Sequence, residues 1–92
     1  MDKSRQKRKP DPRLKIFAQR LKMLREERGW TQEYLAELLD TKKSLISYYE
    51  NAEREPRYTV ILKLRDIFNE DSDWIMGDSN TRRIKKIASG EN

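Results

Sequence analysis

The sequence predicts an all-α fold, a compact arrangement of five short helices, and three observations support that prediction. Apolar residues recur three and four positions apart, which is the spacing of one helix face, and no run alternates as a half-buried strand would. Residues that commonly cap helices, such as Asp11 before Pro12, stand just ahead of these periodic runs. The chain of 92 residues has room for one small domain.

The first helix is predicted to begin at Asp11-Pro12. It is expected to end at Gly29, because glycine readily adopts the left-handed conformation that closes a helix. Between these ends lies a single apolar stripe formed by Leu14, Phe17, Ala18, Leu21 and Leu24.

The second and third helices are predicted to be short and close together. Thr31 is expected to open the second helix. The inner side of that helix is expected to comprise Leu35, Ala36, Leu38 and Leu39. After Asp40, Thr41 is expected to cap a third helix. The buried positions of the third helix are expected to be Leu45, Ile46 and Tyr49.

The last two helices follow a polar loop that ends near Pro56, because the residue before a proline disfavours helical geometry. The fourth helix is expected to begin at Thr59. Its apolar positions are Val60, Ile61, Leu64, Ile67 and Phe68. Asp71 is expected to cap a fifth helix of residues 72–76 that ends at Gly77.

The two ends of the chain are basic and poor in apolar residues. Lys and Arg number 21 against 16 Asp and Glu, a net charge of +5. We expect a disordered basic arm at residues 1–10, a folded domain at 11–77 and a basic tail at 78–92. The tail could fray, or it could form a short helix that docks or dimerises. The arm could lie along a DNA groove, or it could be a solvated tail with no contact to DNA.

The composition argues against several classes of chemistry. The chain has no Cys and no His, so it lacks disulfides, Cys-ligated zinc, a thiol nucleophile and the commonest general base. Its three Gly are isolated and form no glycine-rich phosphate loop. No apolar run approaches the roughly 20 residues of a transmembrane helix, and the N-terminus lacks the apolar core of a signal peptide. We therefore expect a cytoplasmic protein that is not an enzyme and uses no metal or other cofactor.

Residues 32–51, QEYLAELLDTKKSLISYYEN, carry the most informative pattern. Two short helices separated by a turn of a few residues are the geometry of a helix-turn-helix. If the apolar positions point inward, the third helix leaves outward a set of hydroxyl, phenol and ammonium groups, namely Lys42, Lys43, Ser44, Ser47 and Tyr48. Such a face suits the major groove of DNA.

Several motifs occur in one order along the chain: RLKMLREERGWTQEYLAELL, KKSLISYYEN, EPRYTVILKL and DWIMG. Together they resemble the phage repressor and Cro family of helix-turn-helix regulators, also called XRE-like regulators, over residues 20–77. The resemblance implies a lambda-repressor-like five-helix DNA-binding domain whose recognition helix spans about residues 42–50. It also implies double-stranded DNA as the partner.

The resemblance assigns roles to individual positions. It implies base contacts by Lys43, Ser44, Ser47 and Tyr48. It implies DNA backbone contacts at the positions around the recognition helix, Gln32, Thr41, Lys42 and Asn51. It implies a structural ion pair between Arg25 and Glu50, for which we expect burial, and dimer contacts by Trp74, Ile75 and Met76.

Two loop arginines and two departures from the family pattern complete the candidate site. Arg54 and Arg57 are expected to hold phosphates, although a solvated loop neutralised by neighbouring acids is the alternative. Asp40 and Ala52 stand where the family usually has Gly, and Asp tolerates the left-handed conformation better than most residues.

These residues predict a sequence-specific transcriptional regulator, most readily a repressor that binds an inverted-repeat operator as a homodimer. Half-sites about 34 Å apart are the spacing known for such dimers. The alternatives are an antitoxin or protein-interaction adaptor on the same fold and a non-specific nucleic-acid binder. A protein partner or antirepressor could regulate the chain.

Overall fold

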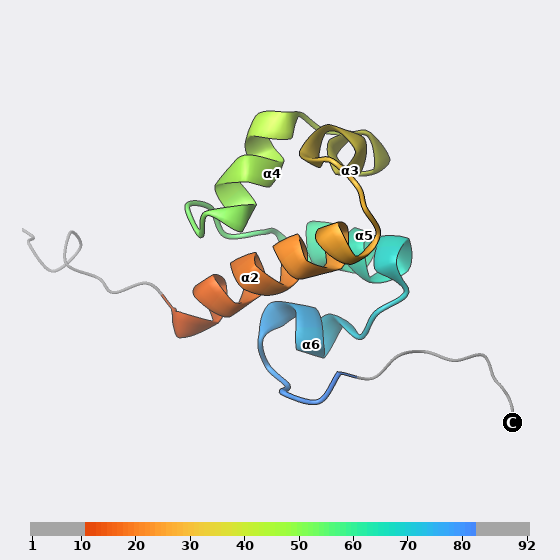
Figure 1. Ribbon diagram of the computed structural model, residues 1–92. Coiled ribbons are helices and arrows are strands. Elements are labelled where there is room, and N and C mark those ends of the chain that lie inside the picture. Colours follow the sequence, from red (N-terminus) through yellow and green to blue (C-terminus); the bar gives the residue numbers. More distant parts are fainter. Residues whose placement is uncertain (1–10, 83–92) are drawn as a thin grey trace, which may run out of the picture.

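A computed structural model describes residues 11–82 and contains five helices within them, which confirms the all-α prediction (Figure 1). The helices are α2 (Pro12–Glu27), α3 (Gln32–Leu38), α4 (Lys43–Glu50), α5 (Tyr58–Phe68) and α6 (Ser72–Met76). The predicted arm at residues 1–10 and residues 83–92 of the predicted tail lie outside the described residues. None of the helices within the described range is long and apolar enough to cross a membrane.

Three of the helices begin at the residues that the sequence predicted. The side chains of Asp11, Thr31 and Asp71 each accept a hydrogen bond from a backbone N–H two or three residues later. These bonds satisfy N–H groups that would otherwise lack a partner in the first turn. α5 begins one residue before the predicted Thr59, at Tyr58.

The predicted cap at Thr41 is wrong, because Thr41 belongs to the end of α3. Its backbone N–H donates to the Ala36 carbonyl at 2.8 Å, and the N–H of Asp40 donates to the Glu37 carbonyl at 3.1 Å. This pair of bonds is the Schellman closure of a helix, and it places Asp40 in the left-handed region at φ 58°. α4 consequently begins after Lys42, which makes no side-chain capping bond.

Helix α2 runs through the middle of the molecule, with α3 and α4 above it in Figure 1 and α6 below it. Its buried residues Phe17, Leu21 and Leu24 belong to one core cluster with side chains from all the other helices. The prediction that Leu38 faces inward is wrong, since that side chain is 40% exposed. Leu38 lies about 60° around the helix from Leu35, and Leu39 lies on the other side of Leu35. The neighbouring helices cover the side of Leu35 and Leu39 but not the side of Leu38.

Residues 78–82 do not behave as the free start of a tail, as the predicted boundary at residue 77 would imply. Gly77 adopts φ 88° and lies so close to α2 that an added Cβ would approach Arg13 and Ile16 to 3.3 Å. The next five residues make polar contacts to α2 residues from its first turn to its last. We call residues 78–82 the C-terminal strap.

Three sets of polar contacts hold the C-terminal strap. Asp78 pairs with Arg13 at 2.6 Å, and the Ser79 carbonyl accepts from Arg20 at 2.8 Å. Arg82 binds two carboxylates, those of Glu27 and Glu70. The folded unit therefore extends at least to residue 82.

Candidate nucleic-acid interface

Helices α3 and α4 form the helix-turn-helix, and packing fixes which face of α4 is available. Ile46 and Tyr49 are buried beneath α4 in the shared core. Lys43, Ser44 and Tyr48 are exposed on its outer face. The three side chains for which the sequence predicted base contacts are therefore accessible together on one helix.

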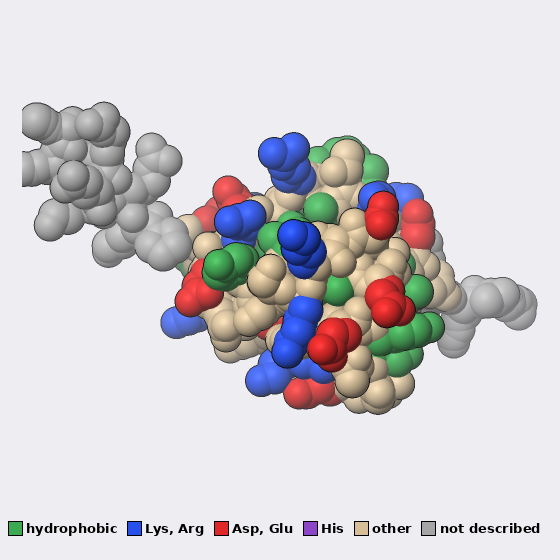
Figure 2. Space-filling view, turned by 90° about the horizontal axis from the view of Figure 1, so that it is seen from above, with side chains coloured by type: hydrophobic (Ala, Val, Ile, Leu, Met, Phe, Trp, Pro, Cys, Tyr) green, Lys and Arg blue, Asp and Glu red, His purple; other side chains and the backbone are tan. Residues whose placement is uncertain are grey.

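This face also carries positive charge. Figure 2 looks down on α3 and α4 and shows Lys and Arg side chains in a line across the middle, with acidic side chains to either side. Lys42, Lys43, Arg54 and Arg57 are all exposed. Four cations, on α4 and in the segments that flank it, give this part of the surface an attraction for phosphates.

The start of α4 adds a second source of positive potential. The helix lacks a side-chain cap at Lys42, so early backbone N–H groups are not satisfied by a capping side chain. Unsatisfied N–H groups and the helix dipole attract anions to a helix N-terminus. Lys42 and the half-buried Thr41 lie where such an anion would be held.

Tyr48 is positioned by an arginine from the following loop. The phenol is 43% exposed, and the Arg54 guanidinium lies 5.1 Å from the centre of its ring. Tyr48 and Arg54 also line a shallow hollow with Lys42 and Ser44 on the outer face of α4. The sequence proposed Arg54 for phosphate contact but gave no sign of this stacking, which joins residues from two elements.

Two further candidates lie at the end of α4. Ser47 is half-buried and accepts a hydrogen bond of 3.4 Å from the side-chain amide of the exposed Asn51. The next residue, Ala52, adopts φ 59° and closes α4 in the same way as Asp40 closes α3. Its N–H donates to the carbonyl of Tyr49 at 3.1 Å.

A buried ion pair fixes α4 against α2, as the sequence predicted. Arg25 donates to both carboxylate oxygens of Glu50 through Nε at 2.7 Å and Nη2 at 3.0 Å. The two side chains are only 12% and 3% exposed, respectively. The hydrogen bonds to Glu50 raise the pKa of the Arg25 guanidinium, so Arg25 remains charged.

Gln32 joins this pair rather than standing free at the start of α3. Its Nε2 donates to Glu50 at 2.9 Å, and the residue is half-buried. The structure thus ties the first residue of α3 to the last residue of α4. The sequence did not indicate this bond, because Gln32 and Glu50 are 18 positions apart and on different helices.

The expected dimer contacts at the end of the domain need correction. Trp74 and Ile75 are 5% and 0% exposed within one chain, so they offer almost no surface to a second copy. The Trp74 ring is also covered by the guanidinium groups of Arg20 and Arg82 at 4.5 and 4.9 Å. Met76 alone of the three is partly exposed.

Comparisons with known proteins agree with this geometry. A family model described as helix-turn-helix matches residues 21–75. The transcriptional regulator ImmR of Bacillus subtilis is 36% identical over 61 residues, which cover 66% of this chain and 48% of ImmR.

Two other similar regulators are AnsR of Bacillus subtilis and PrpR of Mycobacterium tuberculosis. AnsR is 34% identical over 58 residues, or 63% of this chain and 50% of AnsR. PrpR is 35% identical over 69 residues, or 75% of this chain and 14% of PrpR. The chain spans half or less of the length of these relatives. No solved structure matches it.

Proposed function

The chain belongs to the helix-turn-helix family, and on that premise we propose that it binds double-stranded DNA as a sequence-specific transcriptional regulator. We further propose that it is a repressor of the bacterial or phage cytoplasm that binds an inverted-repeat operator as a homodimer. The observation that carries the proposal is the exposed face of α4, where Lys43, Ser44 and Tyr48 are accessible together.

The outer face of α4 provides the chemistry for base recognition. An α-helix fits the major groove, where each base pair presents its own pattern of donors, acceptors and methyl groups. Lys43 favours the acceptors of guanine, whereas the hydroxyls of Ser44 and Ser47 can donate or accept. Tyr48, held against Arg54, offers a ring and a hydroxyl at the same face.

The surrounding groups provide phosphate contacts that orient α4. Arg54 and Arg57 follow the recognition helix, Asn51 ends it, and Lys42 with Thr41 precedes it. Contacts to phosphate position a protein on the duplex without reading sequence. Gln32 donates one amide N–H to Glu50, and its second amide N–H can donate to a phosphate.

Selection from random duplexes, followed by sequencing, tests the proposal. We expect an enriched inverted repeat whose half-sites are separated by about one helical turn, roughly 34 Å. Failure to enrich any sequence would contradict sequence-specific binding and would favour a protein adaptor. Enrichment of a single unrepeated site would retain the DNA-binding function and contradict the dimer.

Two substitutions separate base reading from phosphate attraction on the selected site. Lys43→Ala should lose about 1–3 kcal/mol of discrimination at one base pair. Arg57→Ala should weaken binding to all sequences alike and reduce the salt dependence by about one phosphate contact. Lys22→Ala, an exposed residue on α2 outside the α3–α4 pair, is the matched control and should change neither quantity.

A further inference from the structure

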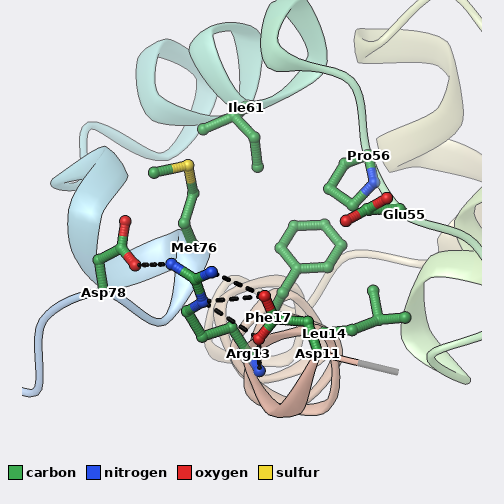
Figure 3. Close-up of a pocket in the computed structure, with 9 residues that line it drawn as sticks. All are labelled: Asp11, Arg13, Leu14, Phe17, Glu55, Pro56, Ile61, Met76 and Asp78. Carbon is green, nitrogen blue, oxygen red and sulfur yellow. Dashed lines mark hydrogen bonds and ion pairs between the residues drawn. The ribbon is translucent and has the colours of Figure 1, made fainter. Parts of the chain in front are cut away.

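A hollow of about 230 Å³ lies between the start of α2, the loop before α5, and α6 (Figure 3). Its apolar lining consists of Leu14, Phe17, Pro56, Ile61 and Met76. An engineered apolar cavity of about 150 Å³ admits benzene, so this hollow has room for a branched aliphatic side chain. The proposed contact to DNA uses none of these side chains.

The rim of the hollow is acidic. Asp11, Glu55 and Asp78 contribute three carboxylates, and Arg13 contributes one guanidinium. Arg13 is occupied by two of the acids, since it binds Asp11 at 2.7 Å and Asp78 at 2.6 Å (Figure 3). Among residues 11–82, Glu55 makes no ion pair. The hollow therefore fits an apolar side chain flanked by cations.

The chain itself contains a segment with that chemistry. Residues 83–88 read RIKKIA, so Ile84 and Ile87 flank two lysines and follow an arginine. The segment carries three positive charges and no negative charge. Its aliphatic side chains match the apolar lining, and its cations complement the acidic rim.

The C-terminal strap ends at the other end of α2 from the hollow of its own chain. Arg82 donates to Glu70 at 2.6 Å and to Glu27 at 2.8 Å, and its guanidinium lies 4.9 Å from the centre of the Trp74 ring. Glu27 is the last residue of α2, whereas the hollow lies at the first turn. The chain beyond Arg82 thus begins at the opposite end of α2.

We propose that residues 83–88 of one copy dock into the hollow of a second copy, with isoleucine inside and the lysines against Glu55 and its neighbours. Reciprocal docking gives a twofold dimer. The inference rests on the proposed dimeric regulator and places the dimer contact away from the buried Trp74 and Ile75. A twofold dimer is the symmetry that an inverted repeat requires.

Disulfide trapping tests this docking directly, because the chain has no cysteine of its own. An E55C chain is mixed, without DNA, with a K85C chain of different mass, under mild oxidation. We expect a mixed disulfide dimer in several-fold greater yield than from a K22C chain paired with K85C. Adding I84D and I87D to the K85C chain should reduce the yield to that of the control.

Each other outcome overturns the docking. A yield equal to the K22C control, or one unchanged by I84D and I87D, would show that the segment does not enter the hollow. A monomeric disulfide in an E55C/K85C chain, without dimer, would show docking within one chain. These results leave the proposed function untouched, because they are measured without DNA and the duplex selection is judged separately.

Discussion

Removing Arg25 should destabilise the domain more than any surface substitution, because it breaks the connection between α2 and the recognition helix. Arg25→Ala deletes two hydrogen bonds to Glu50, at 2.7 and 3.0 Å, and one of 2.7 Å to the Trp30 carbonyl. Glu50 would keep only the bond from Gln32. The carboxylate would then be a buried charge without a cation.

The size of the effect follows from burial. The Glu50 side chain is 3% exposed, so bulk water solvates its charge poorly when the guanidinium is removed. Breaking a buried ion pair by removing one partner costs about 3–5 kcal/mol. Small domains have a free energy of unfolding of about 5–15 kcal/mol, so this loss is a large fraction of the total.

Urea unfolding followed by circular dichroism measures the loss. The double variant Arg25→Ala/Glu50→Gln should recover part of it, because the buried charge is removed as well. Arg65→Ala is the matched control, since Arg65 pairs with Asp66 on the surface with side chains 42% and 70% exposed, and it should cost less than about 1 kcal/mol. An Arg25→Ala chain as stable as the native one, or no recovery in the double variant, would show that the buried pair does not stabilise the domain.

Three further predictions concern the helix ends. Ala52→Gly should stabilise the domain by roughly 0.5–1 kcal/mol in the same urea assay, because Ala52 is held in the left-handed region at φ 59°. A destabilised variant would show that no backbone strain is stored at this position. Thr31→Ala should lower the free energy of unfolding by about 1 kcal/mol, because it removes the side-chain cap of α3. Thr41→Ala should lower it by less, because Thr41 caps no helix. Equal losses would show that Thr31 is not the more important cap. Hydrogen bonds from Arg13 lower the pKa of Asp11 from 3.8 to about 2, so the stability that they contribute should be present above pH 4 and lost as the pH falls towards 2. Carboxyl NMR titration should show a higher pKa of Asp11 in Arg13→Gln. An unchanged pKa in that variant would contradict this cause.

Local signals in the sequence identified most of the fold. The caps at Asp11, Thr31 and Asp71 act within three residues, and the apolar spacing along α2 is a property of one helix. The exposed face of α4 follows from the same spacing, since burial of Ile46 and Tyr49 turns Lys43 outward. Such features need no knowledge of distant residues.

The parts that the sequence could not predict depend on distant residues. The C-terminal strap is held by pairs such as Arg13 with Asp78 and Glu27 with Arg82, which are 65 and 55 positions apart. No periodicity connects such residues. The exposure of Leu38 has a related reason, because it depends on the arc that the neighbouring helices cover and not on the spacing within its own helix.

The sequence predicted which residues of the interface face outward but not the contacts that those residues make. The sequence indicated which residues of α4 face outward, whereas the stacking of Arg54 on Tyr48 and the bond from Gln32 to Glu50 require the folded chain. The burial of Trp74 in its own core also emerged only from packing. Contacts between elements are thus the information that the structure adds.

We expect the outer face of α4 to be the surface that contacts DNA. Titration of the isotope-labelled chain with a selected duplex, followed by amide NMR shifts, tests it most directly. The largest shifts are expected at Lys42 to Tyr48 and in the loop that carries Arg54 and Arg57. Shifts confined to α6 and the C-terminal strap, with α4 unchanged, would contradict it.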